Sequence, residues 1–168
     1  MDSDVAGKAE GHRVTPNVPR EVTVRLRRAT LADAKFILEV RNDPVTVHQA
    51  AHRTAILEGQ HAIWMRRMLH DHSRRLYVAC CGPTAVGTGR LDLLGGGRAR
   101  ASFALAPKWR GRGLGHLLVR ALLDEARDHG ADFVEADVRG LNVASMTVML
   151  RAGFHPISDT LIKMECTL

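Results

Sequence analysis

The sequence lacks any apolar run close to the about 20 residues that a helix needs to cross a membrane, so we expect no membrane partner. Cysteine is scarce. There are three, and Cys80 and Cys81 are adjacent in a strand-like run, which is not the framework of a disulfide-rich secreted protein. No His and Cys residues have the spacing of a zinc site. These absences favour a protein of the reducing cytoplasm that holds no metal.

Aromatic residues are few as well, at 4% of the chain with a single tyrosine. Side chains that could stack on the bases of single-stranded nucleic acid are therefore rare. The net charge of +6 comes mainly from arginines scattered along the chain, with Arg66-Arg67 and Arg74-Arg75 as the densest pairs. Because this charge is not clustered, we expect no nucleic-acid partner; it suits a surface that attracts small anionic ligands.

What the chain does contain fits one globular domain. Its 168 residues are 45% hydrophobic and 25% charged, ordinary values for a protein with a single core. Residues 1–20 have mixed charge, two prolines and no apolar segment of the signal-peptide kind, which predicts a disordered leader. We expect the domain to span residues 21–168, as a monomer or a homodimer.

The most informative segment is a glycine-rich turn between a predicted strand and a predicted amphipathic helix. Gly111, Gly113 and Gly115 carry no Cβ atom, so a ligand can approach the backbone closely. The first turn of the helix offers unpaired N–H groups and the positive end of its dipole, and Arg110 and Arg112 add charge. The segment therefore predicts a site for an anion of the pyrophosphate kind.

Two common anion-binding motifs do not fit this turn. A P-loop needs Lys-Ser or Lys-Thr after its glycines, and a dinucleotide fingerprint needs a glycine where His116 stands. The pattern that fits is Arg-x-x-Gly-x-Gly, formed by Arg110, Gly113 and Gly115. It resembles the acetyl-coenzyme A motif of the GNAT superfamily of N-acetyltransferases.

A second motif lies one strand and one helix downstream. Asn142, Ser145, Gly153 and Phe154 are similar to the superfamily's N-x-x-[AS] segment, which ends in Gly-Phe. Asn142 also suits a helix cap and Gly153 a helix stop. The resemblance implies an acetyl-CoA cofactor bound by the end of the strand, the glycine turn and the second motif: Leu105, Ala106, Arg110, Gly111, Arg112, Gly113, Leu114, Gly115, Asn142 and Ser145.

The resemblance implies a mixed α/β (α+β) GNAT fold. Its parts are a mostly antiparallel sheet of six to seven strands, about four helices and a central β-α-β-α-β cofactor unit. The residue patterns predict elements in this order. Strands are expected at 22–27, 76–81, 85–93, 98–106, 133–138, 154–157 and 161–166. Helices are expected at 30–42, 58–70, from 114 onward and at 142–152, with a loop at 48–54.

The resemblance also implies a chemistry, the attack of a neutral amine on the carbonyl carbon of a thioester. It gives the backbone N–H of Leu105 the role of donor to the oxyanion that forms. Two positions depart from the family. The tyrosine that often assists the departing thiolate is replaced by Met149, and the strand before the turn carries no acid.

Asp92, on the preceding strand, is the candidate general base, acting through a water molecule that Ser102 positions. An ion pair with Arg90 or Arg98 is the alternative role of Asp92, and the sequence leaves both open.

A narrower resemblance lies in the first half of the chain. Arg41-Asn42-Asp43-Pro44 and His61-x-x-Trp64 are similar to a subgroup with two branches. One branch acetylates nucleotide-linked amino sugars, as in pseudaminic acid biosynthesis, and the other acetylates N-termini of ribosomal proteins. The alternative is structural, with a helix stop at Pro44 and Trp64 in the core. The residues expected to contact a small-molecule amine acceptor are Arg41, His48, His52, His61 and Trp64.

Three functions are compatible with these patterns. The first is acetyl transfer from acetyl-CoA to the primary amine of a small or nucleotide-linked acceptor. The second is acetylation of a protein, at its N-terminal amine or at a lysine. The third is a non-catalytic sensor that binds acyl-CoA, which the missing tyrosine and strand acid keep open.

Overall fold

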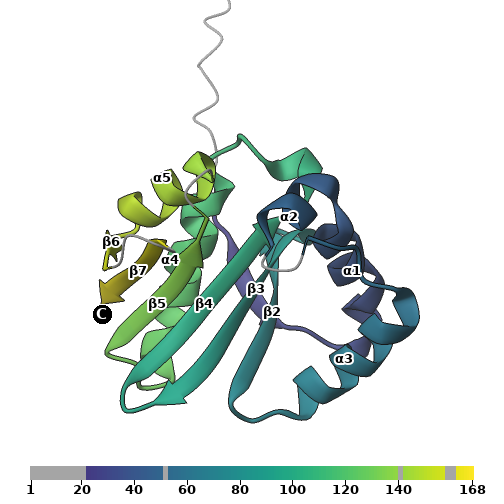
Figure 1. The fold of residues 1–168 in the computed structure, drawn as a ribbon, viewed down its shortest axis with the longest axis horizontal. Helices are drawn as coiled ribbons and strands as arrows, with labels where there is room; N and C mark the ends of the chain where they lie inside the picture. Colours follow the sequence, from purple (N-terminus) through teal and green to yellow (C-terminus); the bar gives the residue numbers. More distant parts are fainter. Residues whose placement is uncertain (1–21, 51–52, 140–141, 158–161) are drawn as a thin grey trace, which may run out of the picture.

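The computed structural model describes residues 22–50, 53–139, 142–157 and 162–168, in a mixed α/β arrangement (Figure 1). The strands are β1 (Arg25–Arg28), β2 (Arg74–Cys81), β3 (Thr84–Gly95), β4 (Arg98–Leu105), β5 (Phe133–Val138), β6 (His155–Pro156) and β7 (Ile162–Thr167). The α-helices are α1 (Ala34–Asn42), α2 (Pro44–Gln49), α3 (Glu58–His70), α4 (Leu114–Asp128) and α5 (Val143–Arg151).

These strands form one sheet in the order β1-β2-β3-β4-β5-β7-β6. Every neighbouring pair is antiparallel except β4 and β5, which are parallel and are joined by the crossover helix α4. The predicted fold and its central β-α-β-α-β unit are confirmed. The sheet opens at one place: β4 pairs with β5 only along Arg98–Arg100, and both strands then run on without pairing to each other.

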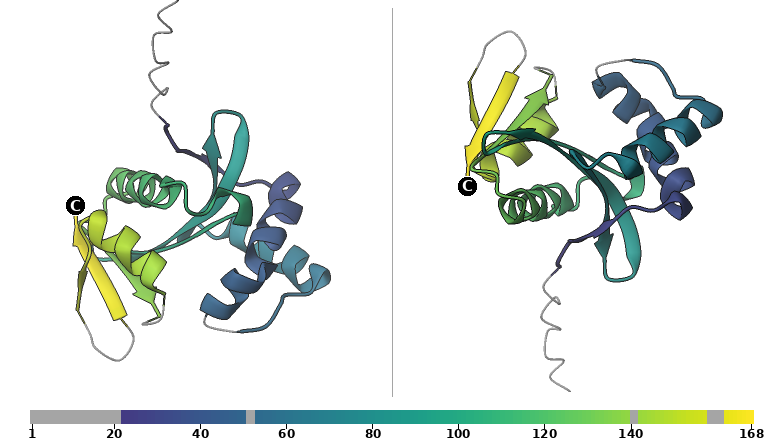
Figure 2. Two further views of the ribbon diagram at one scale, coloured as in Figure 1. Left: turned by 90° about the horizontal axis from the view of Figure 1, so that it is seen from above. Right: turned by 90° about the horizontal axis from the view of Figure 1, so that it is seen from below.

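Helices cover the two faces of the sheet in separate layers (Figure 2). Along β2, Tyr77 and Ala79 pack in the cluster that contains α4, whereas Leu76 and Val78 pack in the cluster beneath α1 and α3. Because alternate residues of a strand face opposite sides, this strand is apolar on both faces. The amphipathic pattern predicted for α4 is likewise confirmed, since its apolar stripe is buried in the core.

Several predicted boundaries differ from the observed ones. The first strand begins at Arg25 instead of Val22, whose side chain is 52% exposed. His48 lies in α2 and not in a loop, which raises the number of α-helices to five in the described part of the chain. Pro44 not only ends α1 but also begins α2, and the Asp43 carboxylate caps it by accepting the Thr46 N–H at 3.0 Å.

The predicted leader, residues 1–20, lies outside the described residues. Among the helices that the structure does describe, none has the length and apolar character required to span a bilayer.

Asp33 holds the start of α1 against β1. Its carboxylate accepts the Thr30 backbone N–H at 2.8 Å, as in a capping box. Arg27 donates two further hydrogen bonds to it, at 2.7 and 2.9 Å. The Arg27 hydrogen bond, which outweighs the opposing effect of burial, lowers the pKa of Asp33 to about 2.

We predict that Asp33→Asn lowers the free energy of unfolding by about 2 kcal/mol at pH 7. The folded-state pKa lies below the ordinary value of 3.8, so ionised Asp33 stabilises the folded state above about pH 4, and this contribution is lost as the pH falls toward 2. Urea denaturation at pH 7 and pH 3 should show the difference between variant and wild type fall by about half. Asp124→Asn, which breaks the exposed pair with Arg127, is the control; a pH-independent loss in Asp33→Asn would contradict the prediction.

Candidate active site

A cavity of about 600 Å³ lies where β4 and β5 separate. Its lining comes from β3, β4 and the end of β5, from α1, α2 and α3 on one side, and from the first turns of α5 on the other. This volume is in the range of sites for small ligands. The separation of two strands therefore gives the protein a pocket that side chains from both halves of the fold can reach.

The glycine turn lies between β4 and α4. Gly111 and Gly113 have φ values of +71° and +77°, and the space where a Cβ atom would stand is open at both. Gly113 caps α4, a helix of 15 residues whose first N–H groups have no intrahelical acceptor. An open backbone at a helix N-terminus is a setting that fits the pyrophosphate of coenzyme A.

Three other residues of the turn and the start of α4 have contacts within the protein. A Cβ atom on Gly115 would lie 3.2 Å from Val148 of α5, so this glycine allows α4 and α5 to pack closely. Leu114 is buried in the core beside it. The side chain of Arg112 lies over the Trp109 ring, with its guanidinium carbon 5.3 Å from the ring centroid.

Arg110 is turned toward α2. Its Nη2 atom lies 2.7 Å from the Asp43 carboxylate and 2.9 Å from the Thr46 hydroxyl oxygen, and its Nε donates to the Leu105 carbonyl at 3.1 Å. The sequence predicts this side chain beside the pyrophosphate, and the structure instead shows it between the glycine turn and the wall of the cavity.

The backbone N–H of Leu105 lies at the end of β4, just after the cavity-lining residues 101–104 of that strand. The next residue, Ala106, donates its N–H to the carbonyl of Val86 in β3 at 2.9 Å. Because N–H groups alternate along a strand, the N–H of Leu105 points away from β3, toward the gap that opens beside β5. This orientation suits the oxyanion donor that the sequence assigns to Leu105.

Asp92 does not line the cavity. Its carboxylate forms an ion pair with Arg90 at 2.9 Å, one of the two roles that the sequence leaves open, and lies 3.9 Å from Arg74 Nε. Arg90 and Ser102 both line the cavity and stand opposite each other in the β3–β4 register. Asp92 therefore contacts a residue of the cavity wall, Arg90, without lining the cavity itself. Its role as a general base stays a prediction.

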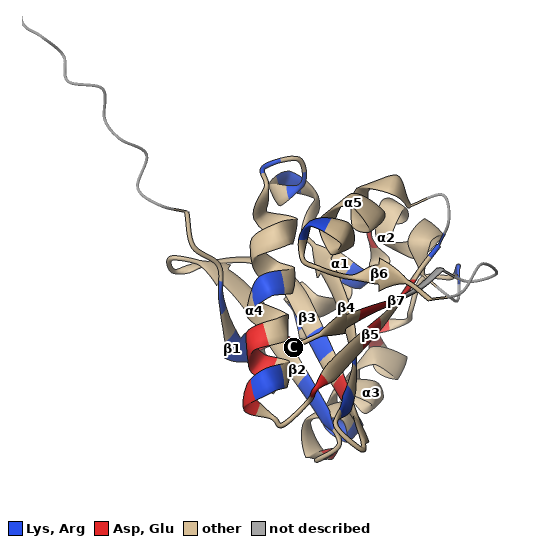
Figure 3. Ribbon diagram, turned by 90° about the vertical axis from the view of Figure 1, so that its left-hand side faces the viewer, with Lys and Arg blue, Asp and Glu red and all other residues tan. Residues whose placement is uncertain are grey.

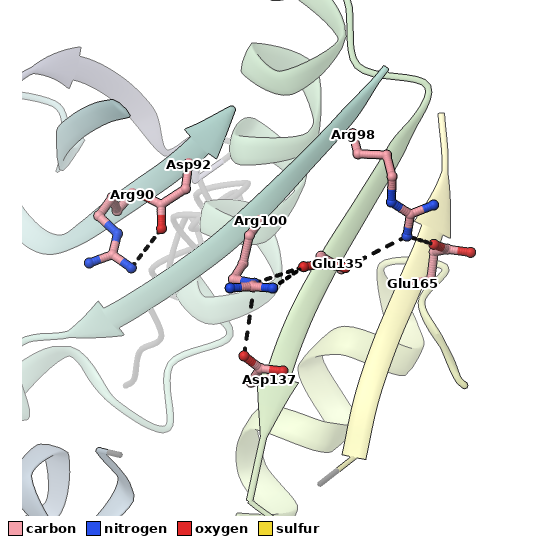
Figure 4. Close-up of polar contacts among 7 residues, drawn as sticks. All are labelled: Arg90, Asp92, Arg98, Arg100, Glu135, Asp137 and Glu165. Carbon is pink, nitrogen blue, oxygen red and sulfur yellow. Dashed lines mark hydrogen bonds and ion pairs between the residues drawn. The ribbon is translucent and has the colours of Figure 1, made fainter. Parts of the chain in front are cut away.

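Asp137 is the one carboxylate among the described residues that line the cavity. It follows Glu135 on the same face of β5, and both approach Arg100: the Nε of Arg100 donates to Glu135 at 2.8 Å and lies 3.9 Å from Asp137 (Figure 4). The sequence analysis does not single out Asp137. The alternation along β5 nevertheless places its side chain on the opposite face of the strand from buried Val138.

On this part of the sheet the arginines of β4 form ion pairs with carboxylates of β5 and β7, whose acidic positions are red in the ribbon of Figure 3. Arg98 pairs with Glu135 and Glu165 and not with Asp92 (Figure 4). Ion pairs that involve exposed arginines contribute little to the free energy of unfolding. Here these ion pairs fix the positions of the charged side chains beside the pocket.

The predicted acceptor residues divide into three groups. Arg41 and Trp64 line the cavity, and so does His61. His48 is exposed on α2 and does not line it, while Thr46 and Gln49 of the same helix do. His52 lies outside the described residues.

His61 is 3% exposed and has a structural contact. Its Nε2 lies 2.9 Å from the Ala34 carbonyl oxygen, and its ring stacks on Trp64 with 5.4 Å between centroids. Burial lowers the pKa of His61 below its ordinary value, so the ring is neutral at pH 7. It therefore supports the aromatic wall that Trp64 presents to the cavity.

The profile of the acetyltransferase (GNAT) domain family matches residues 23–155. This chain belongs to the GNAT acetyltransferase family. A search of curated proteins gives no match. Among solved structures, the aminoglycoside acetyltransferase AAC(6')-Ib with ribostamycin and coenzyme A is 20% identical, with a TM-score of 0.77 over 86% of this chain and 93% of that one. Spermidine N-acetyltransferase from Vibrio cholerae with CoA and spermine is 15% identical, with a TM-score of 0.80 over 86% and 95%.

The second motif of this GNAT domain borders the cavity at α5. Asn142 accepts the Ser145 N–H at 3.1 Å as the helix cap, and both residues line the cavity with Met149, one turn further along the helix. Met149 is 2% exposed and has no proton to donate. The departure from the family pattern thus lies inside the pocket.

We predict that Gly113→Ala weakens the binding of acetyl-CoA by about tenfold or more, because its methyl group would occupy the space through which the diphosphate approaches the backbone. Gly130→Ala is a matched control at the other end of α4, with the same φ of +77° and equally open space. Both variants carry the same backbone strain. Calorimetry should show reduced affinity only in Gly113→Ala; equal affinities in the two would place the diphosphate elsewhere.

Proposed function

We propose that this protein transfers the acetyl group of acetyl-CoA to the primary amine of a small acceptor that carries an anionic group, and specifically a nucleotide-linked amino sugar. The observation that carries the proposal is the charge of the cavity. Among the described residues that line it, Arg41, Arg90 and Arg139 are basic and Asp137 is acidic.

Each part of such an acceptor has a counterpart in the pocket. Guanidinium groups bind phosphate oxygens through paired N–H donors, which suits a diphosphate. Trp64 and Ile37 supply an aromatic and an apolar wall for a base or a sugar ring. Arg90 is held in place by Asp92, so its position on the cavity wall is fixed before a ligand arrives.

Asp137 is the group best placed to hold the amine. An ammonium ion is attracted to this carboxylate, and a water molecule beside it can carry away the proton that the amine must lose before it attacks. Asp92 is the second candidate, since it adjoins the cavity through Arg90.

The donor supplies an activated acetyl thioester when it is bound. The protein contributes the N–H of Leu105 to stabilise the oxyanion and a pocket that holds the two reactants together. Ser145 of α5 lines the cavity one turn before Met149 and carries a hydroxyl group there. Acetyl transfer in this site therefore relies on positioning and on backbone electrostatics more than on a side-chain acid.

A panel of amines tests the acceptor class by thiol release from acetyl-CoA: a UDP-linked amino sugar, the free amino sugar, kanamycin, spermine and a peptide with a free N-terminus. We predict that the UDP-linked sugar has the highest kcat/KM and that added salt raises its KM. Arg41→Met should raise that KM by about tenfold, and Arg66→Met, on the exposed side of α3, should leave it unchanged. Faster turnover of the peptide would favour the protein-modifying alternative, and no turnover of any amine would favour the sensor.

The two carboxylates are compared in the same assay. We predict that Asp137→Asn lowers kcat/KM by roughly 100-fold while the affinity for acetyl-CoA stays the same. Asp92→Asn should have a smaller effect, because its carboxylate acts through Arg90. A larger loss in Asp92→Asn would return the role of the base to Asp92.

A further inference from the structure

Arg110 connects parts of the molecule that belong to different halves of the site. The residue belongs to the glycine turn, its Nε binds the carbonyl of Leu105 at the end of β4, and its Nη2 binds α2. The guanidinium is half-buried, with 29% of its side chain exposed, and Asp43 is 11% exposed. A charged pair that is largely removed from water and has ideal distances holds its partners more firmly than a surface pair does.

The contacts on the α2 side are equally specific. Asp43 is the N-cap of α2, and Thr46, whose hydroxyl accepts a second bond from Arg110, lines the cavity. Burial alone would raise the pKa of Asp43, but the hydrogen bonds from Arg110 and from the Thr46 N–H lower it below the ordinary value. The carboxylate is therefore ionised throughout the neutral range.

The chain on the other side of α2 is held by a separate contact. The side chain of Asn42 accepts the Ile56 N–H and donates to the Ile56 carbonyl, both at 2.8 Å. Asn42 thus links the end of α1 to the segment before α3, whereas Asp43 links α2 to β4 through Arg110. Among the described elements α2 packs mainly against α1, so the Arg110–Asp43 link adds a separate tie between α2 and β4.

We propose that Arg110 is a positioning residue that fixes the acceptor wall, α2, to the strand end that carries the oxyanion donor, and that it does not serve as a ligand of the cofactor pyrophosphate. The residue sets the distance between the amine and the carbonyl it attacks. The proposal rests on acetyl transfer in this cavity but not on the identity of the acceptor.

Arg110→Met and Arg112→Met test this directly, because the two arginines flank Gly111 in the same turn and only the first contacts α2. In Arg110→Met we expect the Kd for acetyl-CoA to stay within about threefold of wild type, and hydrogen exchange of residues 44–49 in the free protein to rise about tenfold. In Arg112→Met we expect weaker acetyl-CoA binding and unchanged exchange in α2. A loss of acetyl-CoA affinity in Arg110→Met, with α2 exchange as in wild type, would overturn the proposal.

A double-mutant cycle isolates the ion pair. Asp43→Asn keeps the helix cap and removes the charge, so it should raise hydrogen exchange in α2 as Arg110→Met does. Exchange in α2 of the double variant should be no faster than in either single variant. Additive effects would show that the two residues act separately and would contradict the proposal. Arg110→Lys retains the charge without the fork and should restore part of the protection.

The kinetic readout uses the amine of the panel that turns over fastest. Arg110→Met should raise its KM by about tenfold with a smaller change in kcat, and Arg110→Lys should recover part of the loss. An unchanged KM would contradict the proposal. If no amine of the panel turns over, the proposed function fails, while acetyl-CoA affinity and α2 exchange still decide the role of Arg110.

Discussion

The separation of β4 from β5 is the constraint on which the site depends. Backbone pairing between them ends after Arg100, and each strand then continues to the edge of the cavity paired only on its other side, β4 with β3 and β5 with β7. Unpaired backbone groups are costly when buried, so a strand that leaves its partner needs other acceptors and donors. Here the Leu105 carbonyl receives Arg110, and the Leu105 N–H faces the gap, where a reacting carbonyl would use it. The break in the sheet thus supplies both the cavity and its backbone donor.

Charge is distributed unevenly around that cavity. The wall near α1 and β3 is basic, through Arg41 and Arg90, whereas the far wall carries the carboxylate of Asp137 on β5, followed by Arg139. A ligand with an anionic part and an amine would meet groups of opposite charge at both ends. The arginines of the sheet beside the pocket, Arg98 and Arg100, are paired with Glu135 and Glu165, so they lie in fixed positions next to the cavity lining.

The sequence predicts the order of strands and helices, the glycine turn and the cap at Asn142, because these depend on local spacing and on residues with distinct backbone preferences. It does not predict α2. Asp43-Pro44 is typical both of a helix end, here that of α1, and of a helix start, here that of α2, and the pattern alone does not show that both occur. The sequence also does not predict which way the side chains at the site point. That Arg110 turns toward α2, or that His61 binds the Ala34 carbonyl, depends on contacts between segments far apart in the chain.

A crystal structure with a non-reactive analogue of acetyl-CoA would show where the diphosphate and the acetyl group bind. We predict the diphosphate at the N–H groups that follow Gly111, and the thioester oxygen within hydrogen-bonding distance of the Leu105 N–H. The acetyl group should face the cavity between Ser102 and Asp137, with Arg110 still bound to Asp43. A diphosphate bound by the Arg110 guanidinium, or an acetyl group outside the gap between β4 and β5, would contradict this prediction.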